Sequence, residues 1–314
     1  MSIVPQGYYF ERIAKERLCD LIPLYKGAFN QDVGLKELID KYDTEYVGVS
    51  YIGYIAYTVN GDPAAYYGVF PMKMEINGRI CLISQSGDTM THPSHQGKGL
   101  FVNLAKHTYE LCISMGILAV FGFPSASSYP GFTKKLDWIH HENILKFTLW
   151  TPTFPLGELS RYFHFIRSIH QRWAKLVLGL ISSQTIFPGS VLTHQQNGVN
   201  RSKDFFEYKL RNPSVVNLQW KQTNFIVKIS TFLGVGDIQF PNERFEESLR
   251  ILKIFAFFAG LNRIVFYVSP DSYLAKKLQT KTKGVSGLAI GYRNFSPSID
   301  LKDVSYTYVD FDTF

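Results

Sequence analysis

The stretch with the clearest chemical potential runs from Gly87 to Phe101 and reads GDTMTHPSHQGKGLF. A predicted strand enters it, and an apolar pattern with helical spacing begins at Leu100. The first amides of a helix have no partner within the helix, and the helix dipole favours negative charge there. Gly97 and Gly99 permit a close approach of the backbone to a phosphate, and Lys98 adds a positive charge. The pattern therefore predicts a cradle for a pyrophosphate group.

Two common phosphate-binding patterns do not fit these residues. The dinucleotide pattern lacks its third glycine here, and the P-loop pattern lacks its Lys-Ser/Thr pair. The residues instead resemble the Gln/Arg-x-x-Gly-x-Gly/Ala signature of the GNAT N-acetyltransferase superfamily. Gln96 and Gly99 match that signature, whereas Phe101 stands where Gly or Ala is usual. A His-Pro pair shortly before the signature, here His92-Pro93, is also common in that superfamily.

A second resemblance to GNAT proteins lies between Phe123 and Trp138. In that superfamily the strand after the cradle helix leads into a short helix that touches the cofactor, and an aromatic residue follows. The order and spacing are the same here. The Asn common at the position of Ser125 is absent, and the Tyr that often acts as general acid would fall near Thr133. The resemblance covers about residues 10–150.

The resemblance implies a donor and a reaction. The donor would be acetyl-CoA or another acyl-CoA, and the acyl group would pass to an amine by direct attack in a ternary complex, with no metal. The pantetheine arm would run along the backbone of the strand before the cradle. The implied cofactor contacts are Met90, Thr91, His92, Gln96, Gly97, Lys98, Gly99, Leu100, Phe101, Ser125 and Ser128.

Two residues are candidates for acid–base chemistry. Asp88 is the candidate base, acting directly or through water, and the alternative is a turn cap or a partner for a lysine. Tyr129 is the candidate acid for the leaving thiolate, and the alternative is a packed aromatic ring. Cys112 lies on the apolar side of a predicted helix, which favours a core position over a nucleophile. His140 and His141 are neighbours on a predicted strand and point to opposite faces, so we expect no shared metal.

The elements expected around these residues form an α+β fold. A helix over 11–29 precedes antiparallel strands over 46–59, 64–74 and 79–91. A helix over 100–115 and an apolar strand over 117–123 complete a parallel strand–helix–strand unit. This order agrees with the mixed, twisted, helix-flanked sheet that a GNAT domain implies.

The second half of the chain echoes the first. Gly236-Asp237-Ile238 resembles Gly87-Asp88-Thr89, and a predicted helix over 243–259 and a strand over 263–268 follow it. That helix begins with acidic residues and has no glycine before it, so its start would repel a pyrophosphate. Further strands are expected over 225–232, 235–240, 285–292 and 304–311. We therefore expect a GNAT acetyltransferase domain over 1–150, a helical linker over 151–202 and a second, degenerate GNAT-like domain over 203–314.

The linker contains a predicted basic amphipathic helix over 159–181. One interpretation is a helix packed between two domains, and the other is an interfacial helix that meets a membrane surface. The net charge of +7 is spread along the chain with no dense basic tract, so we do not expect nucleic acid as a partner. Three widely spaced cysteines, no leader-like start and no long apolar run favour a cytoplasmic protein.

The functional hypothesis is an acyl-CoA-dependent N-acyltransferase, most simply an N-acetyltransferase. Cytoplasmic bacterial enzymes of similar layout often modify amino sugars or other small amines, so the resemblance suggests a small amine acceptor such as a nucleotide-linked amino sugar. Two alternatives stay open: a non-catalytic acyl-CoA sensor, and a peptidoglycan-type aminoacyl transferase that takes aminoacyl-tRNA. The acceptor, the acyl length and the oligomeric state are left open.

Overall fold

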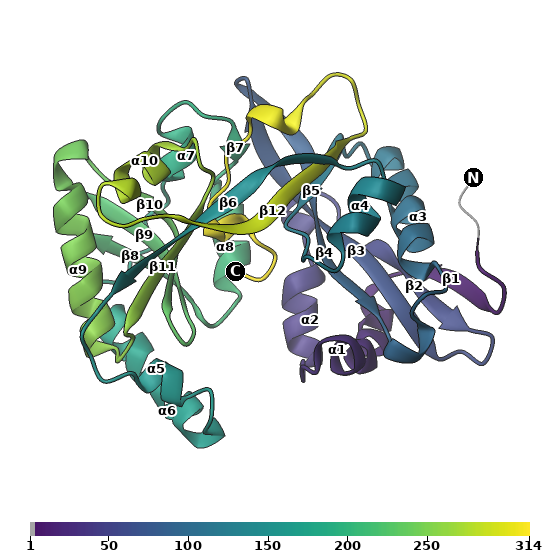
Figure 1. The fold of residues 1–314 in the computed structure, drawn as a ribbon, viewed down its shortest axis with the longest axis horizontal. Helices are drawn as coiled ribbons and strands as arrows, with labels where there is room; N and C mark the ends of the chain where they lie inside the picture. The colour runs from purple at the N-terminus through teal and green to yellow at the C-terminus, as the bar shows by residue number, and fades with distance from the viewer. Residues whose placement is uncertain (1–3) are drawn as a thin grey trace. The chain divides into compact units, whose positions relative to one another are not determined.

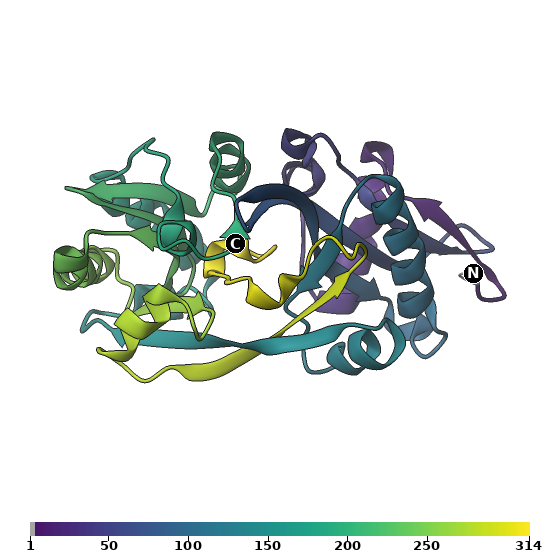
Figure 2. The same cartoon turned by 90° about the horizontal axis from the view of Figure 1, so that it is seen from above.

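The computed structural model describes residues 4–314 and divides the chain into two units. The first unit ends at His141 and also includes Ala289–Lys302, and the second comprises Glu142–Leu288 and Asp303–Phe314. Two long strands, β6 (Ile139–Trp150) and β12 (Val285–Asn294), each belong to both units and are teal and yellow-green in Figures 1 and 2. This division differs from the expected boundaries at 150 and 202. The reason is that the end of β6 pairs with residues 263–268, and the end of β12 pairs with residues 119–122, in each case far away in sequence.

The first unit is built on a mixed sheet. Strands β1 to β4 pair antiparallel in order, β5 joins β4 in parallel, and the end of β12 adds antiparallel to β5. Helix α3 crosses from β4 to β5, as a parallel pair requires. The elements are β1 (Tyr8–Arg12), α1 (Leu21–Phe29), α2 (Leu35–Tyr42), β2 (Ile52–Thr58), β3 (Pro63–Ile76), β4 (Arg79–Thr91), α3 (Leu100–Ser114), β5 (Ala119–Gly122) and α4 (Tyr129–Lys135).

Two apolar layers cover this sheet. Helix α3 buries Leu104 and Cys112 against Tyr67 and neighbouring residues on one face. Helices α1 and α2 bury apolar side chains against Ile55 and Phe70 on the opposite face. Figure 1 shows α3 and α4 apart from α1 and α2 in the same way. Alternate residues of the strands therefore face different helices, so each face can carry its own chemistry.

A β-bulge interrupts the pairing of β3 with β4 at Asp88, the candidate base. Tyr66 pairs with Met90 and Gly68 with Gly87, so two residues of β4 oppose one residue of β3. Asp88 lies in the bulge with a φ of 51°, a left-handed conformation that Asp and Asn tolerate better than most residues. The bulge sets the direction in which the Asp88 side chain leaves the strand.

The expectation of one helix over 11–29 is wrong. Residues up to Arg12 form β1, a short 3-10 helix follows, and α1 begins only at Leu21. Pro23 explains the late start, because a residue without a backbone N–H is tolerated only in the first turn of a helix. Helices α2, α8 (Lys203–Leu210) and α10 (Tyr273–Gln279) were not predicted, because each is short and its apolar pattern spans only about two turns.

The second unit repeats the strand order of the first. Strands β8, β9 and β10 pair antiparallel, β11 joins β10 in parallel, and the end of β6 adds antiparallel to β11. Its elements are α5 (Leu156–Leu159), α6 (His164–Gly179), α7 (Gly189–Leu192), β7 (Gly198–Val199), α8 (Lys203–Leu210), β8 (Val215–Trp220), β9 (Thr223–Ile229), β10 (Leu233–Gln239), α9 (Phe245–Phe258), β11 (Arg263–Val268) and α10 (Tyr273–Gln279).

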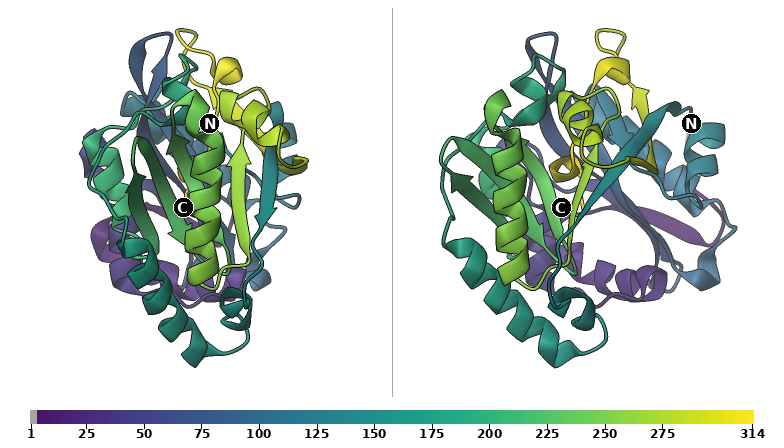
Figure 3. Two further views of the ribbon diagram at one scale, coloured as in Figure 1. Left: turned by 90° about the vertical axis from the view of Figure 1, so that its left-hand side faces the viewer. Right: turned by 60° about the vertical axis from the view of Figure 1, so that its left-hand side comes forward.

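The equivalence extends to the bulge. In β10 the extra residue is Gly236, directly before the paired Asp237, whereas in β4 Asp88 and Thr89 are the residues outside the register, directly after the paired Gly87. Helix α9, green in Figure 3, then crosses to β11 and packs with α6 on one apolar core. The two units therefore share a strand order, a crossover helix and a bulge beside the Gly-Asp pair.

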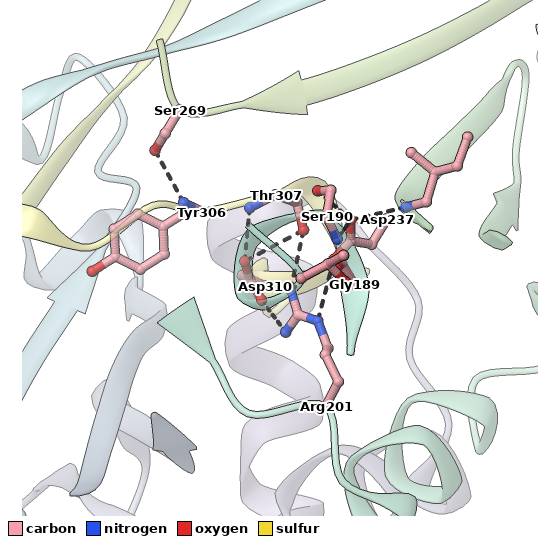
Figure 4. A network of polar contacts seen from close by, with 10 residues as sticks. Gly189, Ser190, Arg201, Asp237, Ser269, Tyr306, Thr307 and Asp310 are labelled. Atoms are coloured by element: carbon pink, nitrogen blue, oxygen red, sulfur yellow. Dashed lines mark hydrogen bonds and ion pairs between the residues drawn. The ribbon is translucent and has the colours of Figure 1, made fainter. Parts of the chain in front are cut away.

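A buried ionic network ties the end of the chain to the second unit (Figure 4). Arg201 lies between two carboxylates, with Nη1 2.6 Å from Asp310 and Nη2 3.3 Å from Asp237. Asp237 also accepts hydrogen bonds from the backbone N–H and the hydroxyl of Ser190.

The prediction of a strand over 304–311 is wrong. Thr307 and Asp310 instead form a capping box around a 3-10 helix.

Lys209 in α8 predicts a pH-dependent stability. Burial lowers the pKa of Lys209 to about 7, and its Nζ donates to the Phe311 carbonyl at 2.8 Å. Between that pKa and the ordinary lysine value near 10.4 the unfolded chain holds the extra proton, so the free energy of unfolding rises with pH. We expect the free energy of unfolding of the parent, measured in urea, to rise relative to that of Lys209→Met. The expected rise is about 1 kcal/mol per pH unit from pH 7 to 9. A difference that stays constant over this range contradicts the assignment.

Candidate active site

The predicted cradle lies at the start of α3. Gly99 is the N-cap residue with a φ of 75°, and Gly97 has a φ of 74°. A Cβ atom on Gly97 would meet no atom within 4 Å, and one on Gly99 would meet only the side chain of Asn103 at 3.6 Å. The first turn of α3 carries no acidic residue. Exposed backbone, open space and a positive helix end therefore coincide at this point, which is the environment that a pyrophosphate requires.

Residues outside the signature hold the cradle loop in place. The Tyr8 hydroxyl lies 2.8 Å from His95 Nδ1, and the Lys98 ammonium lies 5.6 Å from the centre of the Tyr8 ring. Asn103 Nδ2 donates to the Gly99 carbonyl at 3.0 Å. Sequence reasoning missed Tyr8 and Asn103. No local signal marks Tyr8, because β1 lies far from the loop in sequence.

His92 has a local structural role. Its Nδ1 accepts from the Ser94 N–H at 3.4 Å and lies 2.7 Å from the Ser94 hydroxyl, so it caps the short helix Pro93–His95. Its ring packs against α1 at Gly27, where a Cβ atom would come within 2.6 Å of the imidazole. These contacts engage one ring nitrogen and one side of the imidazole, so they favour a structural role for His92.

Most of the other predicted cofactor contacts expose backbone atoms rather than side chains at the cradle. The side chains of Met90 and Leu100 are buried in the two apolar layers. Thr91 is half-buried and pairs with Ala65 of β3, whereas the Gln96 side chain is exposed beside the two glycines. These residues can therefore contact a cofactor through backbone atoms, which depend little on side-chain identity.

Phe101 departs from the GNAT signature, and its side chain packs away from the loop. Its ring lies 5.0 Å from the Phe132 ring, measured between centroids. A Cβ atom on Gly131 would come within 2.5 Å of Phe101, so this glycine leaves room for the large ring. The contact joins α3 to α4, and the α3 start carries no bulky group that points back over the glycines.

The parallel pairing of β4 and β5 is short. Only Ser84 with Val120 and Gln85 with Phe121 are in register. Strand β5 ends at Gly122, whereas β4 continues to Thr91. Beyond Gln85 the β4 backbone therefore leaves its parallel neighbour, and its peptide groups run toward the cradle outside that ladder.

Asp88 is the centre of a polar cluster on the α1 and α2 face. Its Oδ2 accepts from the hydroxyl of Tyr25 at 2.5 Å and from that of Tyr42 at 2.8 Å, and its Oδ1 pairs with Lys41 at 2.7 Å. The carboxylate is 7% exposed. Burial and then the Asp88 charge raise the pKa of both tyrosines, which keeps them protonated as donors. Sequence reasoning allowed a lysine partner for Asp88 but identified neither Lys41 nor the two tyrosines, which come from helices distant in sequence.

Gln85 lies on β4 and is only 1% exposed. Neither its Oε1 nor its Nε2 has a hydrogen-bond partner within the described residues. Its pairing partners Phe70 and Phe121 offer no polar side-chain atoms. A buried amide without partners is costly and rare, so Gln85 is an unsatisfied polar group on the strand that leads to the cradle.

The predicted short helix forms, and it begins at Tyr129. The Tyr129 ring packs edge-on against His140 of β6 at 5.7 Å. The hydroxyls of Ser125 and Ser128 lie 3.1 Å apart, so the two serines satisfy each other in the turn before the helix. Thr133 donates to the Tyr129 carbonyl, and nothing in this helix other than Tyr129 offers a phenol.

Neither Cys112 nor the metal-ligating residue types form a further reactive site in the part of the chain that the structure describes. Cys112 is buried in the α3 layer, and burial raises the pKa of its thiol to about 12, which makes it a poor nucleophile at neutral pH. Within residues 4–314, no three His, Cys, Asp or Glu side chains are grouped in a way that could hold a metal ion.

Comparisons with known proteins concern the domain that contains these residues. Residues 10–140 match the model of the acetyltransferase (GNAT) domain. A GCN5-related N-acetyltransferase from Kribbella flavida has a TM-score of 0.60 at 11% identity, over 91% of this chain and 72% of that one. One from Anabaena variabilis has a TM-score of 0.57 at 12% identity, over 92% and 73%. A Pyrococcus horikoshii protein has a TM-score of 0.57 at 10% identity, over 98% and 95%. A search of curated proteins finds no match.

The fold and the cradle together define the class. Residues 10–140 form a GNAT acetyltransferase domain, and the structural likeness extends the fold over nearly the whole chain. The family match is confined to this domain, whose class is that of the acyl-CoA N-acyltransferases. Across the described residues, every helix is too short or too polar to cross a membrane.

Proposed function

We propose that the first unit binds acetyl-CoA, or a close acyl-CoA, and acetylates a small primary amine. The observation that carries this proposal is the pair Gly97 and Gly99, both left-handed, at the open N-terminus of a fifteen-residue helix. Helix-start amides hold the pyrophosphate and Lys98 adds charge. The bound thioester supplies an activated acyl group.

The β4 edge holds the rest of the donor. Beyond Gln85 the strand leaves β5, so the backbone of Met90 and Thr91 is available to align an extended pantetheine arm. Ser125 and Ser128 lie before α4, which contacts α3 through Phe132. We infer that these two serines contact the donor from the α4 side, opposite the β4 backbone.

The acceptor side is the face that carries Gln85 and the Asp88 cluster. Gln85 offers one donor and one acceptor group, which suits a hydroxyl or an amide of the acceptor. Tyr129 as the acid for the leaving thiolate stays a prediction. A tyrosine hydroxyl carries a proton that it can give to a leaving thiolate within hydrogen-bond reach.

Asp88 as a general base also stays a prediction, which its asparagine variant tests. Three donors already occupy the two carboxylate oxygens, so we infer a positioning role. Asp88→Asn keeps the left-handed backbone and removes the negative charge that pairs with Lys41. We expect the free energy of unfolding to fall by about 2 kcal/mol, while the pH profile of kcat/KM keeps its shape. Loss of the acidic limb of that profile assigns the base role to Asp88 instead.

We propose that the second unit is a degenerate copy without a cofactor site of its own. It shares the strand order and the bulge of the first unit. Helix α9, however, begins with Glu246 and Glu247 in its first turn, and no glycine precedes it there. Asp237, at the position equivalent to Asp88, is bound to Arg201 in the core. The acidic helix start therefore disfavours a bound anion, and the ion pair with Arg201 keeps Asp237 in the core of the second unit.

The acceptor class is testable by product release. Acetyl-CoA and the purified chain are incubated with amines, first free and nucleotide-linked amino sugars, and free CoA is measured with a thiol reagent. Acceptor-dependent release of CoA supports the transferase and names the class of amine. Tight acetyl-CoA binding without release for any amine favours the sensor alternative. Absence of acetyl-CoA binding contradicts the proposal and brings the aminoacyl-tRNA alternative forward.

A further inference from the structure

Helix α6 carries two apolar stripes, and only one of them is covered. His170, Ala174 and Leu178 face the core of the second unit. The second stripe repeats at intervals of three and four residues and is 49–77% exposed. Its members are Phe165, Ile169, Trp173, Leu176 and Leu180. A surface helix normally needs one apolar stripe, so the second is left over after packing.

The exposed stripe continues onto its neighbours. Figure 3 shows α6, in teal, beside α9, in green, at the margin of the second unit. The Trp173 indole N–H donates to the Phe258 carbonyl at 2.8 Å, which fixes the ring while it stays half exposed. The exposed rings of Phe154, Phe257 and Phe258 extend the same apolar surface, together with Tyr162 and Phe163 before the helix. Contiguous apolar surface of this kind marks an interaction site.

The charges of α6 itself have one sign, because the helix contains no acidic residue. At 100° per residue, Arg172 and Lys175 lie on the side of the stripe away from the core, whereas Arg167 lies on the opposite face of the helix. Arg161 stands just before the helix. Large aromatic and aliphatic side chains bordered by cations are the composition of helices that lie in a membrane interface.

We propose that the α6 stripe, defined as Phe165, Ile169, Trp173, Leu176 and Leu180, binds a membrane surface rich in anionic lipid. The apolar side chains enter the boundary between head groups and acyl chains, and the cations meet lipid phosphates. Trp173 suits the boundary, because its N–H is already bonded while its ring is free. This surface is separate from the cradle, so the inference does not depend on acetyl-CoA binding.

Vesicle flotation tests the inference. The full chain is mixed with phosphatidylcholine vesicles with or without phosphatidylglycerol, at low and at physiological salt. We expect flotation with the anionic vesicles, weakened by salt and by removal of phosphatidylglycerol. The variant Phe165→Ser/Ile169→Ser/Leu176→Ser is expected to bind at least about 100-fold more weakly, because each buried side chain contributes about ten-fold. Arg172→Gln/Lys175→Gln is expected to lose about five-fold per cation, on anionic vesicles only.

A matched control separates the patch from general surface hydrophobicity. Val59→Ser/Ile80→Ser/Ile113→Ser removes three exposed apolar side chains from the first unit and is expected to float like the parent. All variants should keep the circular dichroism spectrum and the cooperative thermal melt of the parent, which shows that they fold. Failure of the parent to float, or equal flotation of the α6 variant, overturns the proposal. A parent that sediments as a dimer and becomes a monomer in the α6 variant also overturns it, because the stripe then binds a second copy.

Discussion

Gly99→Glu is expected to abolish the stabilisation of the chain by acetyl-CoA. At 100 times its dissociation constant a ligand raises the free energy of unfolding by about 2.7 kcal/mol. The new side chain enters the space in front of the α3 amides, where a Cβ atom meets only Asn103 at 3.6 Å, and its charge repels a pyrophosphate. A loss of affinity of at least about 100-fold reduces the stabilisation to less than about 0.5 kcal/mol. Thermal melts with and without acetyl-CoA measure both values.

The chain offers a matched control at the other end of the same helix. Gly116 follows α3, has a φ of 77°, and a Cβ atom there would meet nothing within 4 Å. Gly116→Glu therefore adds the same charge and a similar backbone strain, at a distance from the cradle. It is expected to lower the melting temperature while it keeps the full acetyl-CoA shift. Equal shifts in the parent and in Gly99→Glu contradict the cofactor site at this helix start.

Arg201→Met is expected to be the most destabilising substitution in the second unit. The guanidinium is 2% exposed and pairs with the fully buried carboxylates of Asp237 and Asp310. Its removal leaves two buried negative charges without a cation, and breaking such a network costs about 3–5 kcal/mol. We expect the free energy of unfolding in urea to fall by at least that amount, with release of the C-terminal segment that Thr307 and Asp310 anchor.

Two further variants isolate the electrostatic cause. Arg17→Met removes an arginine whose ion pair with Glu11 is exposed, and it is expected to cost no more than about 1 kcal/mol. Arg201→Met combined with Asp237→Asn and Asp310→Asn leaves no uncompensated charge and should recover a large part of the loss. If the triple variant is as unstable as Arg201→Met, shape rather than charge holds the network together.

The cradle was predictable from the sequence because its parts are contiguous. A strand, two glycines, a lysine and the start of an apolar helix occur within a few residues, and the chemistry is that of local backbone amides. Helix α3 begins at Leu100 as predicted, and β4 ends at Thr91. The echo of Gly87-Asp88 in Gly236-Asp237 was visible in the sequence for the same reason, since each pair is a local feature of one strand.

The tertiary structure alone decided which groups meet these elements. Asp88 meets Tyr25 and Lys41 because α1 and α2 pack on the face to which the bulge directs it, and no local pattern encodes that meeting. Likewise, the periodicity of α6 specifies its apolar stripes but not which of them the sheet covers. Residues close in sequence set backbone conformation and spacing. Long-range packing sets burial, and burial determines whether a carboxylate, a lysine or an aromatic side chain is structural or free to bind.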